Sequence, residues 1–348
     1  KKIEKLKEET YYFRLSKYQK QLLKLYENKN FVLPKERRNE IIARVKEGVQ
    51  DLSITRTNFR WGIPFPLDDK HVIYVWFDAL LNYLSGAGKK QEFWPADVHL
   101  LGKDNSWFHA VIWPAMLLSA GYKVPKTVFV HGFLTFNGQK ISKSLGNVIS
   151  PNYLSERYGS NSVRYFLCRH IPFADGNDGD FSEKALIDRH NNELADKLGN
   201  LVSRVSALAE KTGIEKCEND LLQKNLLEYP RKIRPIQSNE SRLNQIKKYI
   251  ESYQLDKALN EIFYFIDVCN EYIQKTQPWK DSCKDRKKIL YELSDSIKAI
   301  AILLWPFIPY TSEKIAKTIG FEIKFDNIAK PLAVKKVKKS EILFKKIK

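Results

Sequence analysis

Residues 98–131 read VHLLGKDNSWFHAVIWPAMLLSAGYKVPKTVFVH. Short β-branched and apolar runs open and close this stretch, at Val98–Leu101 and Val128–His131, and a helix-length segment, Asp104–Ala120, separates them. Two buried strands joined through a helix are typical of a βαβ unit, in which the strands are parallel. The stretch therefore predicts part of a parallel α/β sheet.

The alternation of strands and helices extends towards the N-terminus and fades beyond Pro151. Val72–Phe77 is a third β-branched and aromatic run, which we expect to be another strand. Earlier residues predict two helices around Pro34, from apolar spacings of three and four at Tyr12, Leu15, Tyr18, Leu22 and Leu25, then Ile41, Ile42, Val45 and Val49. Amphipathic patterns at 185–210, 242–276 and 285–304 predict a helical bundle. The predicted fold class is α/β followed by all-α.

Composition narrows the classes of function. The chain has 348 residues, 43% of them hydrophobic, which excludes global disorder. Its longest apolar run, residues 299–309, is too short for a membrane span. A net charge of +18, from 59 Lys and Arg against 41 Asp and Glu, favours an anionic partner such as nucleic acid over a membrane surface.

No metal site or disulfide framework is predicted. The four cysteines, at 168, 217, 269 and 283, form no C-x-x-C pair, so a reducing compartment is expected. Asp175, Asp178 and Asp180 lack EF-hand spacing because Gly179 takes the fifth ligand position, and we expect a solvated turn there.

The segment most informative about chemistry is 137–147, NGQKISKSLGN. It has neither the G-x-x-x-x-G-K-[ST] nor the G-x-G-x-x-G spacing with which backbone amides cradle phosphates. Phosphate contact would come instead from the ammonium groups of Lys140 and Lys143. Such a loop suits a reaction in which charge develops on a triphosphate, because cations can stabilise the transition state.

Residues 140–144, KISKS, resemble the K-M-S-K-S signature of class I aminoacyl-tRNA synthetases, with Ile141 at the methionine position. Further blocks resemble the methionyl-tRNA synthetase family in particular, in order YYFRLS (11–16), ITR (54–56), WGIP (61–64), YVWFDA (74–79), GKD (102–104), FH (108–109), WPA (113–115), LGNLVSR (198–204) and PW (278–279). This collinear series covers nearly the whole chain and is highly specific.

The resemblance implies the second half of a class I Rossmann catalytic domain followed by an anticodon-binding bundle. The expected segments are the end of a connective region with a helical entry (1–60), the half-domain with the KISKS loop (61–150), a linking stem-contact fold (151–184) and the bundle (185–348). The family's first half, with its H-I-G-H motif, has no match here. We therefore expect this chain alone to be inactive, with a separate N-terminal half as a candidate partner.

The resemblance also implies a methionine pocket and an ATP site. The matching pocket residues are Trp76, Tyr83, Asp104, His109, Trp113 and Arg56. Aromatic rings suit a thioether side chain, which offers dispersion and sulfur-to-ring contacts, and a carboxylate such as Asp104 can hold the substrate ammonium. For ATP, bound with Mg²⁺ as substrate, the matching residues are Lys143, Lys140, Gly102 and His131, the two lysines being the catalytic candidates.

Three residues match positions that meet the tRNA anticodon: Asn200, Arg204 and Trp279. Unpaired RNA bases are read by hydrogen bonds to their edges and by stacking on aromatic or guanidinium planes, which these side chains offer.

The function implied is methionine–tRNA ligase, forming methionyl-adenylate from methionine and ATP and transferring the amino acid to tRNA(Met), in the cytoplasm or, alternatively, the mitochondrial matrix. The alternatives are a class I synthetase for another apolar amino acid and a non-catalytic tRNA-binding protein.

Overall fold

Residues 98–131 form the predicted βαβ unit in the computed structural model, which describes residues 8–88, 92–136, 138–141, 149–172, 176–228, 240–334 and 336–348. The chain divides into two compact units, residues 1–133 with 174–177 and residues 134–173 with 178–348. Each unit is described by itself.

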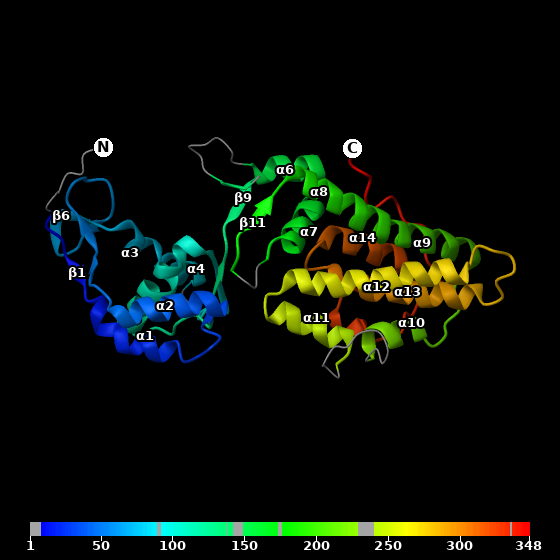
Figure 1. Ribbon diagram of the computed structural model, residues 1–348, viewed down its shortest axis with the longest axis horizontal. Helices are drawn as coiled ribbons and strands as arrows, with labels where there is room; N and C mark the ends of the chain where they lie inside the picture. Colours follow the sequence, from blue (N-terminus) through cyan, green and yellow to red (C-terminus); the bar gives the residue numbers. More distant parts are fainter. Residues whose placement is uncertain are drawn as a thin grey trace. The chain divides into compact units, whose positions relative to one another are not determined.

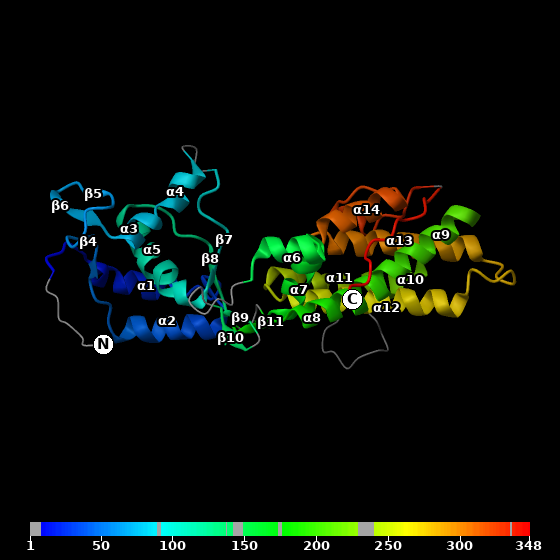
Figure 2. The same ribbon diagram turned by 90° about the horizontal axis from the view of Figure 1, so that it is seen from above.

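The first unit contains a three-stranded parallel sheet. Its order is β2 (Val32–Leu33), β8 (Thr127–His131), β7 (Val98–Gly102), and β7 and β8 are labelled in Figure 2. The helices of this unit are η1 (Leu15–Tyr18), α1 (Gln19–Leu25), α2 (Lys35–Glu47), α3 (Val75–Ala79), α4 (Asn82–Ala87), η2 (Lys103–Asn105), the π-helical turn η3 (Phe108–Ile112) and α5 (Trp113–Ser119). One core joins the sheet to α1, α2 and α5, because their apolar faces are buried together.

Short antiparallel strands complete the first unit. They are β1 (Tyr12–Phe13) with β3 (Leu52–Ser53), and a sheet in the order β4 (Thr55–Arg56), β6 (Asp68–Ile73), β5 (Pro64–Phe65).

The second unit is mostly helical (Figures 1 and 2). It begins with a small sheet in the order β10 (Gln139–Lys140), β9 (Leu134–Phe136), β11 (Gly179–Phe181). Its helices are α6 (Pro151–Tyr158), α7 (Ser160–His170), α8 (Glu183–Arg189), the π-helical η6 (His190–Gly199), α9 (Asn200–Thr212), α10 (Asp220–Leu222), the π-helical η7 (Gln223–Leu227), α11 (Arg242–Glu251), α12 (Leu255–Thr276), α13 (Arg286–Leu304), α14 (Pro309–Ile319) and η8 (Phe325–Asn327).

The bundle is built around α13, which packs against α9, α12 and α14. The largest core of the protein lies between these helices. No helix in the described ranges is long and apolar enough to cross a membrane.

Three secondary-structure predictions are wrong in detail. The run Val72–Phe77 is not one strand, because β6 ends at Ile73 and α3 begins at Val75; β6 also belongs to the antiparallel sheet. Tyr12 lies in β1 rather than in a helix, since its backbone pairs with Ser53. The pattern across 242–276 is two helices, interrupted near Tyr253, whose φ of 61° is incompatible with a continuing right-handed helix.

Of the aspartates expected in a solvated turn, Asp175 lies outside the described residues, and Asp180 is exposed but does not lie in a turn. It belongs to β11, and its carboxylate accepts hydrogen bonds from the Thr135 hydroxyl and the Gly138 amide, each at 2.7 Å. These bonds lower the pKa of the Asp180 carboxyl, the amide of Gly138 having the larger effect.

Candidate functional site

The carboxyl ends of β7 and β8 bring three predicted residues together. Gly102 and His131 are paired in register at the ends of the two strands, and Asp104 follows in η2. A Cβ added at Gly102 would lie 3.1 Å from Asp104 Oδ1 and 3.8 Å from His131 Cε1. Glycine therefore leaves room for the carboxylate to fold back over the strand end. Ligands of open α/β sheets bind outside such strand ends.

An aromatic cluster lies in the same unit. Trp76 of α3 stacks on Phe108, with ring centroids 4.1 Å apart. The Tyr83 ring of α4 lies 5.7 Å from His109 and 6.1 Å from Trp113. His109 and Trp113 are buried, whereas Tyr83 is 37% exposed. The structure thus gathers Trp76, Tyr83, His109 and Trp113, as the sequence predicts.

Hydrogen bonds fix the proton positions in this cluster. The Nδ1 of His109 lies 3.0 Å from the Asn105 carbonyl oxygen, which can only accept, so Nδ1 carries the proton. Burial lowers the pKa of His109, which keeps the imidazole neutral and makes Nε2 an acceptor. The Tyr83 hydroxyl, 2.9 Å away, therefore donates to Nε2. Burial also raises the pKa of Tyr83, so the phenol stays protonated.

The π-helical turn that carries His109 has a local cause. Pro114 has no N–H, so the helical hydrogen bond to the Ala110 carbonyl four residues earlier cannot form. The hydroxyl of Tyr26 donates to that carbonyl instead, at 2.7 Å. A wider turn before α5 follows, and it presents His109 to Tyr83.

Some predicted residues lie elsewhere. Arg56 donates to the Ser53 hydroxyl and the Thr55 carbonyl, and its guanidinium lies 4.3 Å from the Tyr74 ring centroid. Ser53 lies in β3, Thr55 in β4 and Tyr74 just before α3, and none of the three belongs to the aromatic cluster. For the KISKS loop, the structure describes the backbone of Lys140, in β10. Lys143 lies outside the described residues.

In the second unit, Arg204 and Trp279 come into contact. The Arg204 guanidinium carbon lies 5.1 Å from the Trp279 ring centroid, a cation–π arrangement. Asn200 is exposed one helical turn before Arg204 on α9. Helix α12 ends before Gln277, whose left-handed φ of 47° and the following proline turn the chain and leave Trp279 41% exposed.

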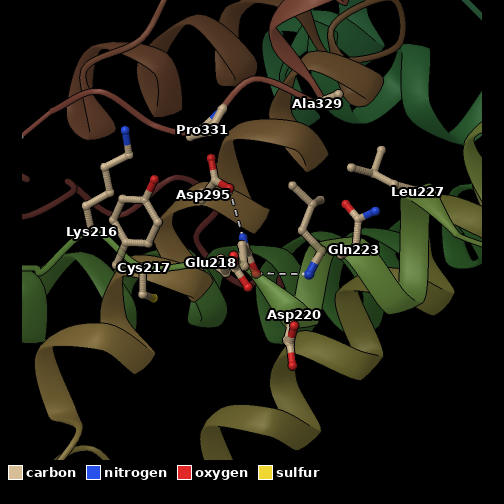
Figure 3. Close-up of a pocket in the computed structure, with 12 residues that line it drawn as sticks. Lys216, Cys217, Glu218, Asp220, Gln223, Leu227, Asp295, Ala329 and Pro331 are labelled. Atoms are coloured by element: carbon tan, nitrogen blue, oxygen red, sulfur yellow. Dashed lines mark hydrogen bonds between the residues drawn. The ribbon is translucent and has the colours of Figure 1, made fainter.

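A cavity of about 610 Å³ lies elsewhere in the second unit, beside α10, α13 and residues 329–331 (Figure 3). Asn219 lines this cavity, and its side-chain NH2 group donates to Asp295 Oδ2 at 2.9 Å and to the Glu292 carbonyl at 3.0 Å. The predicted site residues do not line it. In the parts of the chain that the structure describes, no cluster of three or more His, Cys, Asp or Glu is arranged for a metal ion.

Phe108 and His99 are among the neighbours of the cluster that sequence reasoning missed. Phe108 stacks on Trp76, and His99 lies edge-on to the Tyr83 ring at 4.3 Å. A signal existed for His99: strand alternation puts it on the same face as Leu101, where a polar residue is unusual.

Comparison with known proteins gives two family matches. Residues 1–206 match the family described as tRNA synthetases class I (M), and residues 238–345 match the anticodon-binding domain of tRNA ligase. Among curated relatives, the methionine–tRNA ligase of Thermotoga maritima is 43% identical over 92% of this chain and 51% of its own length. That of Brucella suis is 42% identical over 95% of this chain and 66% of its own.

Solved structures agree. The Mycobacterium tuberculosis methionyl-tRNA synthetase in complex with methionyl-adenylate superposes with a TM-score of 0.86 at 35% identity, covering 96% of this chain and 68% of that one. Its apo form gives 0.85 at 33% identity, covering 98% and 69%. The chain spans about half to two-thirds of the length of the curated relatives it matches.

Proposed function

The chain belongs to the methionyl-tRNA synthetase family of class I, and from this premise we propose that it contributes the amino-acid pocket and the anticodon contacts of a methionine–tRNA ligase. The reaction joins methionine to ATP as methionyl-adenylate, with release of pyrophosphate, and transfers the methionyl group to tRNA(Met). The observation that carries the proposal is the aromatic cluster of Trp76, Tyr83 and His109 in the unit that also places Asp104 at the end of β7.

The pocket chemistry suits methionine. Apolar rings satisfy the thioether by dispersion, and the carboxylate of Asp104 attracts the α-ammonium group. The Tyr83–His109 pair is neutral, so it places no net charge beside the uncharged side chain of methionine. Arg56 is the pocket candidate with the weakest support, because its contacts are with residues outside the aromatic cluster.

ATP, with Mg²⁺ as its counterion, is the proposed second substrate. Gly102 and His131 lie at the strand ends where α/β sheets bind nucleotides. We assign Lys143 and Lys140 to the phosphates on their resemblance to the family signature. Lys143→Ala should raise the activation free energy of methionine-dependent pyrophosphate exchange by ~2–4 kcal/mol, and so slow the exchange, with little change in the KM for methionine. An unchanged rate with a raised KM would contradict this assignment.

A further polypeptide segment is proposed to complete the parallel sheet. Among the described residues β7 is an edge strand, and its Leu100 is 62% exposed. Unpaired edges are sites for added strands. In the complete natural protein, the amide of Leu100 should exchange with solvent more slowly than in this chain alone.

The cytoplasm is the proposed location. Cys168, Cys217, Cys269 and Cys283 carry free thiols, as is usual in a reducing compartment.

Pyrophosphate exchange in the complete natural polypeptide tests the central proposal. Methionine should drive exchange, whereas leucine and isoleucine should not. Tyr83→Phe and Asp104→Asn should each raise the KM for methionine and leave the KM for ATP unchanged. Exchange driven by another apolar amino acid would overturn the methionine assignment. Specific tRNA binding without any exchange would favour the non-catalytic alternative.

A further inference from the structure

His99 lies behind the proposed methionine pocket, on the parallel sheet rather than on the helices that carry the pocket residues. It is the second residue of β7, and it is only 5% exposed. Its ring meets the Tyr83 ring edge-on, with centroids 4.3 Å apart and planes at 83°. The rings of His109 and Trp94 lie 5.9 and 6.1 Å away.

Packing alone does not account for a histidine at this position. Its Nε2 is buried and has no hydrogen-bond partner in the structure. An unpaired buried polar atom costs free energy, and an apolar side chain would fill the space without that cost. Buried unpaired groups in native proteins call for an explanation, and function is a common one.

Tyr83 is the side chain on which His99 can act. It comes from α4, a helix of six residues, and it is partly exposed. Its hydroxyl is held by His109, and its ring packs against His99, which lies on a strand paired along its whole length with β8. Because His99 lies on the paired strand β7, its contact limits how far the Tyr83 ring can tilt, whereas the short helix α4 alone would fix that ring less firmly.

We propose that His99 is a positioning residue for amino-acid recognition. Its imidazole, in T-shaped contact with the Tyr83 ring, holds that ring in the orientation in which the phenol reaches His109 Nε2, and methionine binds against the pair so fixed. This inference rests on the proposed function, because Tyr83 and His109 must line the methionine pocket. His99 itself acts through Tyr83.

The test is a double-mutant cycle in the complete natural polypeptide, with methionine-dependent pyrophosphate exchange as the assay. His99→Ala should raise the KM for methionine about tenfold, with kcat within about threefold of wild type and the KM for ATP unchanged. In a Tyr83→Phe background the same change should raise the KM less than about threefold, because the hydroxyl it positions is gone. His99→Phe, which keeps a ring edge, should restore most of the affinity.

Leu101→Ala is the matched control, since Leu101 is a buried residue on the same face of β7. It should lower Tm without changing the KM for methionine. The inference is wrong if His99→Ala behaves like Leu101→Ala, if the two changes in the cycle are additive, or if His99→Phe fails to restore affinity while folding normally. Should His99→Ala not fold, His99→Asn removes the same ring edge. If Tyr83→Phe alone leaves the KM for methionine unchanged, the proposed methionine pocket is wrong as well. If Tyr83→Phe raises this KM and His99→Ala does not, only the inference about His99 is wrong.

Discussion

At the scale of single residues, Trp279 has the surroundings that bear most directly on the proposed binding of tRNA. A half-exposed indole with a guanidinium over its face can stack a base and still be held in place by Arg204. The exposed amide of Asn200, one turn from Arg204, adds hydrogen-bonding capacity on the same helix. These features are the ones that recognition of an unpaired base uses.

Trp279→Ala should weaken binding of a tRNA with a CAU anticodon by ~1–3 kcal/mol, and binding of a tRNA with another anticodon much less. Trp305 offers a matched control: it is also a half-exposed tryptophan of the second unit, at 43%, and its Nε1 donates to Glu313. Trp305→Ala should leave the discrimination between the two tRNAs unchanged. Equilibrium binding of both tRNAs measures this. Equal losses for the two tRNAs on Trp279→Ala would mean that Trp279 only packs.

At the scale of elements, Asp180 ties β11 to the β9–β10 hairpin, which leads into the KISKS segment. Gly138 has a φ of 75°, a conformation that glycine adopts without strain, and its amide donates to the carboxylate.

Asp180→Ala should therefore make the Gly138 amide exchange with solvent at least about tenfold faster, because local opening no longer breaks that bond. Asp188→Ala, which removes an exposed carboxylate of α8, should have no such effect. Hydrogen exchange followed by NMR distinguishes the two variants. If the Gly138 amide of Asp180→Ala exchanges as slowly as that of the wild type, the backbone turn is stable without the Asp180 hydrogen bond.

A buried ion pair within α13 is hydrogen-bonded to the segment after α14. Asp295 and Lys298, each 2% exposed, are 2.7 Å apart, and Asp295 also accepts from the Leu332 amide at 2.9 Å and from Asn219. The carboxylate is thus bonded on both oxygens, which offsets its desolvation.

Asp295→Ala should lower the free energy of unfolding by ~3–5 kcal/mol, since Lys298 would remain buried without its partner. Glu341→Ala breaks an exposed pair with Lys314 and should change the free energy of unfolding very little, because solvent screens that pair. Urea unfolding of both variants gives the comparison. Equal losses would mean that burial adds nothing to the Asp295 pair.

Across the whole molecule, burial lowers the pKa of four histidines: His99, His109, His170 and His190. The unfolded chain therefore binds more protons than the folded one once pH falls below about 6.5, the ordinary histidine pKa, and stability drops as pH falls. For His99, burial and the nearby His109 lower the pKa to about 4. Carboxyl groups with lowered pKa, such as Glu193, contribute to acid sensitivity only at lower pH.

Between pH 7.5 and 5.0, His99 alone should account for a loss of about 2 kcal/mol in the free energy of unfolding. In His99→Phe the loss over this pH range should be smaller by that amount. Urea unfolding at the two pH values, followed by tryptophan fluorescence, measures both proteins. The same pH dependence in both would show that His99 is not buried in its neutral form.

Sequence patterns predicted the elements whose signals are local and repeated. The βαβ unit of 98–131, the long helices of the bundle and the family were all predicted, because strand runs, helical periodicity and collinear motifs are encoded by neighbouring residues. The motifs also named most of the residues that meet at the aromatic cluster, and the Arg204–Trp279 contact joins two more.

Strand pairing and side-chain contacts between distant segments were seen only in the tertiary structure. The strand at Val72 ends early and pairs antiparallel because residues 55–56 lie beside it, which no local pattern contains. The roles of His99 and Asp180 arise from Tyr83 and from Gly138, 16 and 42 residues away in the chain. A side chain's pKa, partner and orientation are properties of its surroundings, and surroundings built from remote segments exist only once the chain has folded.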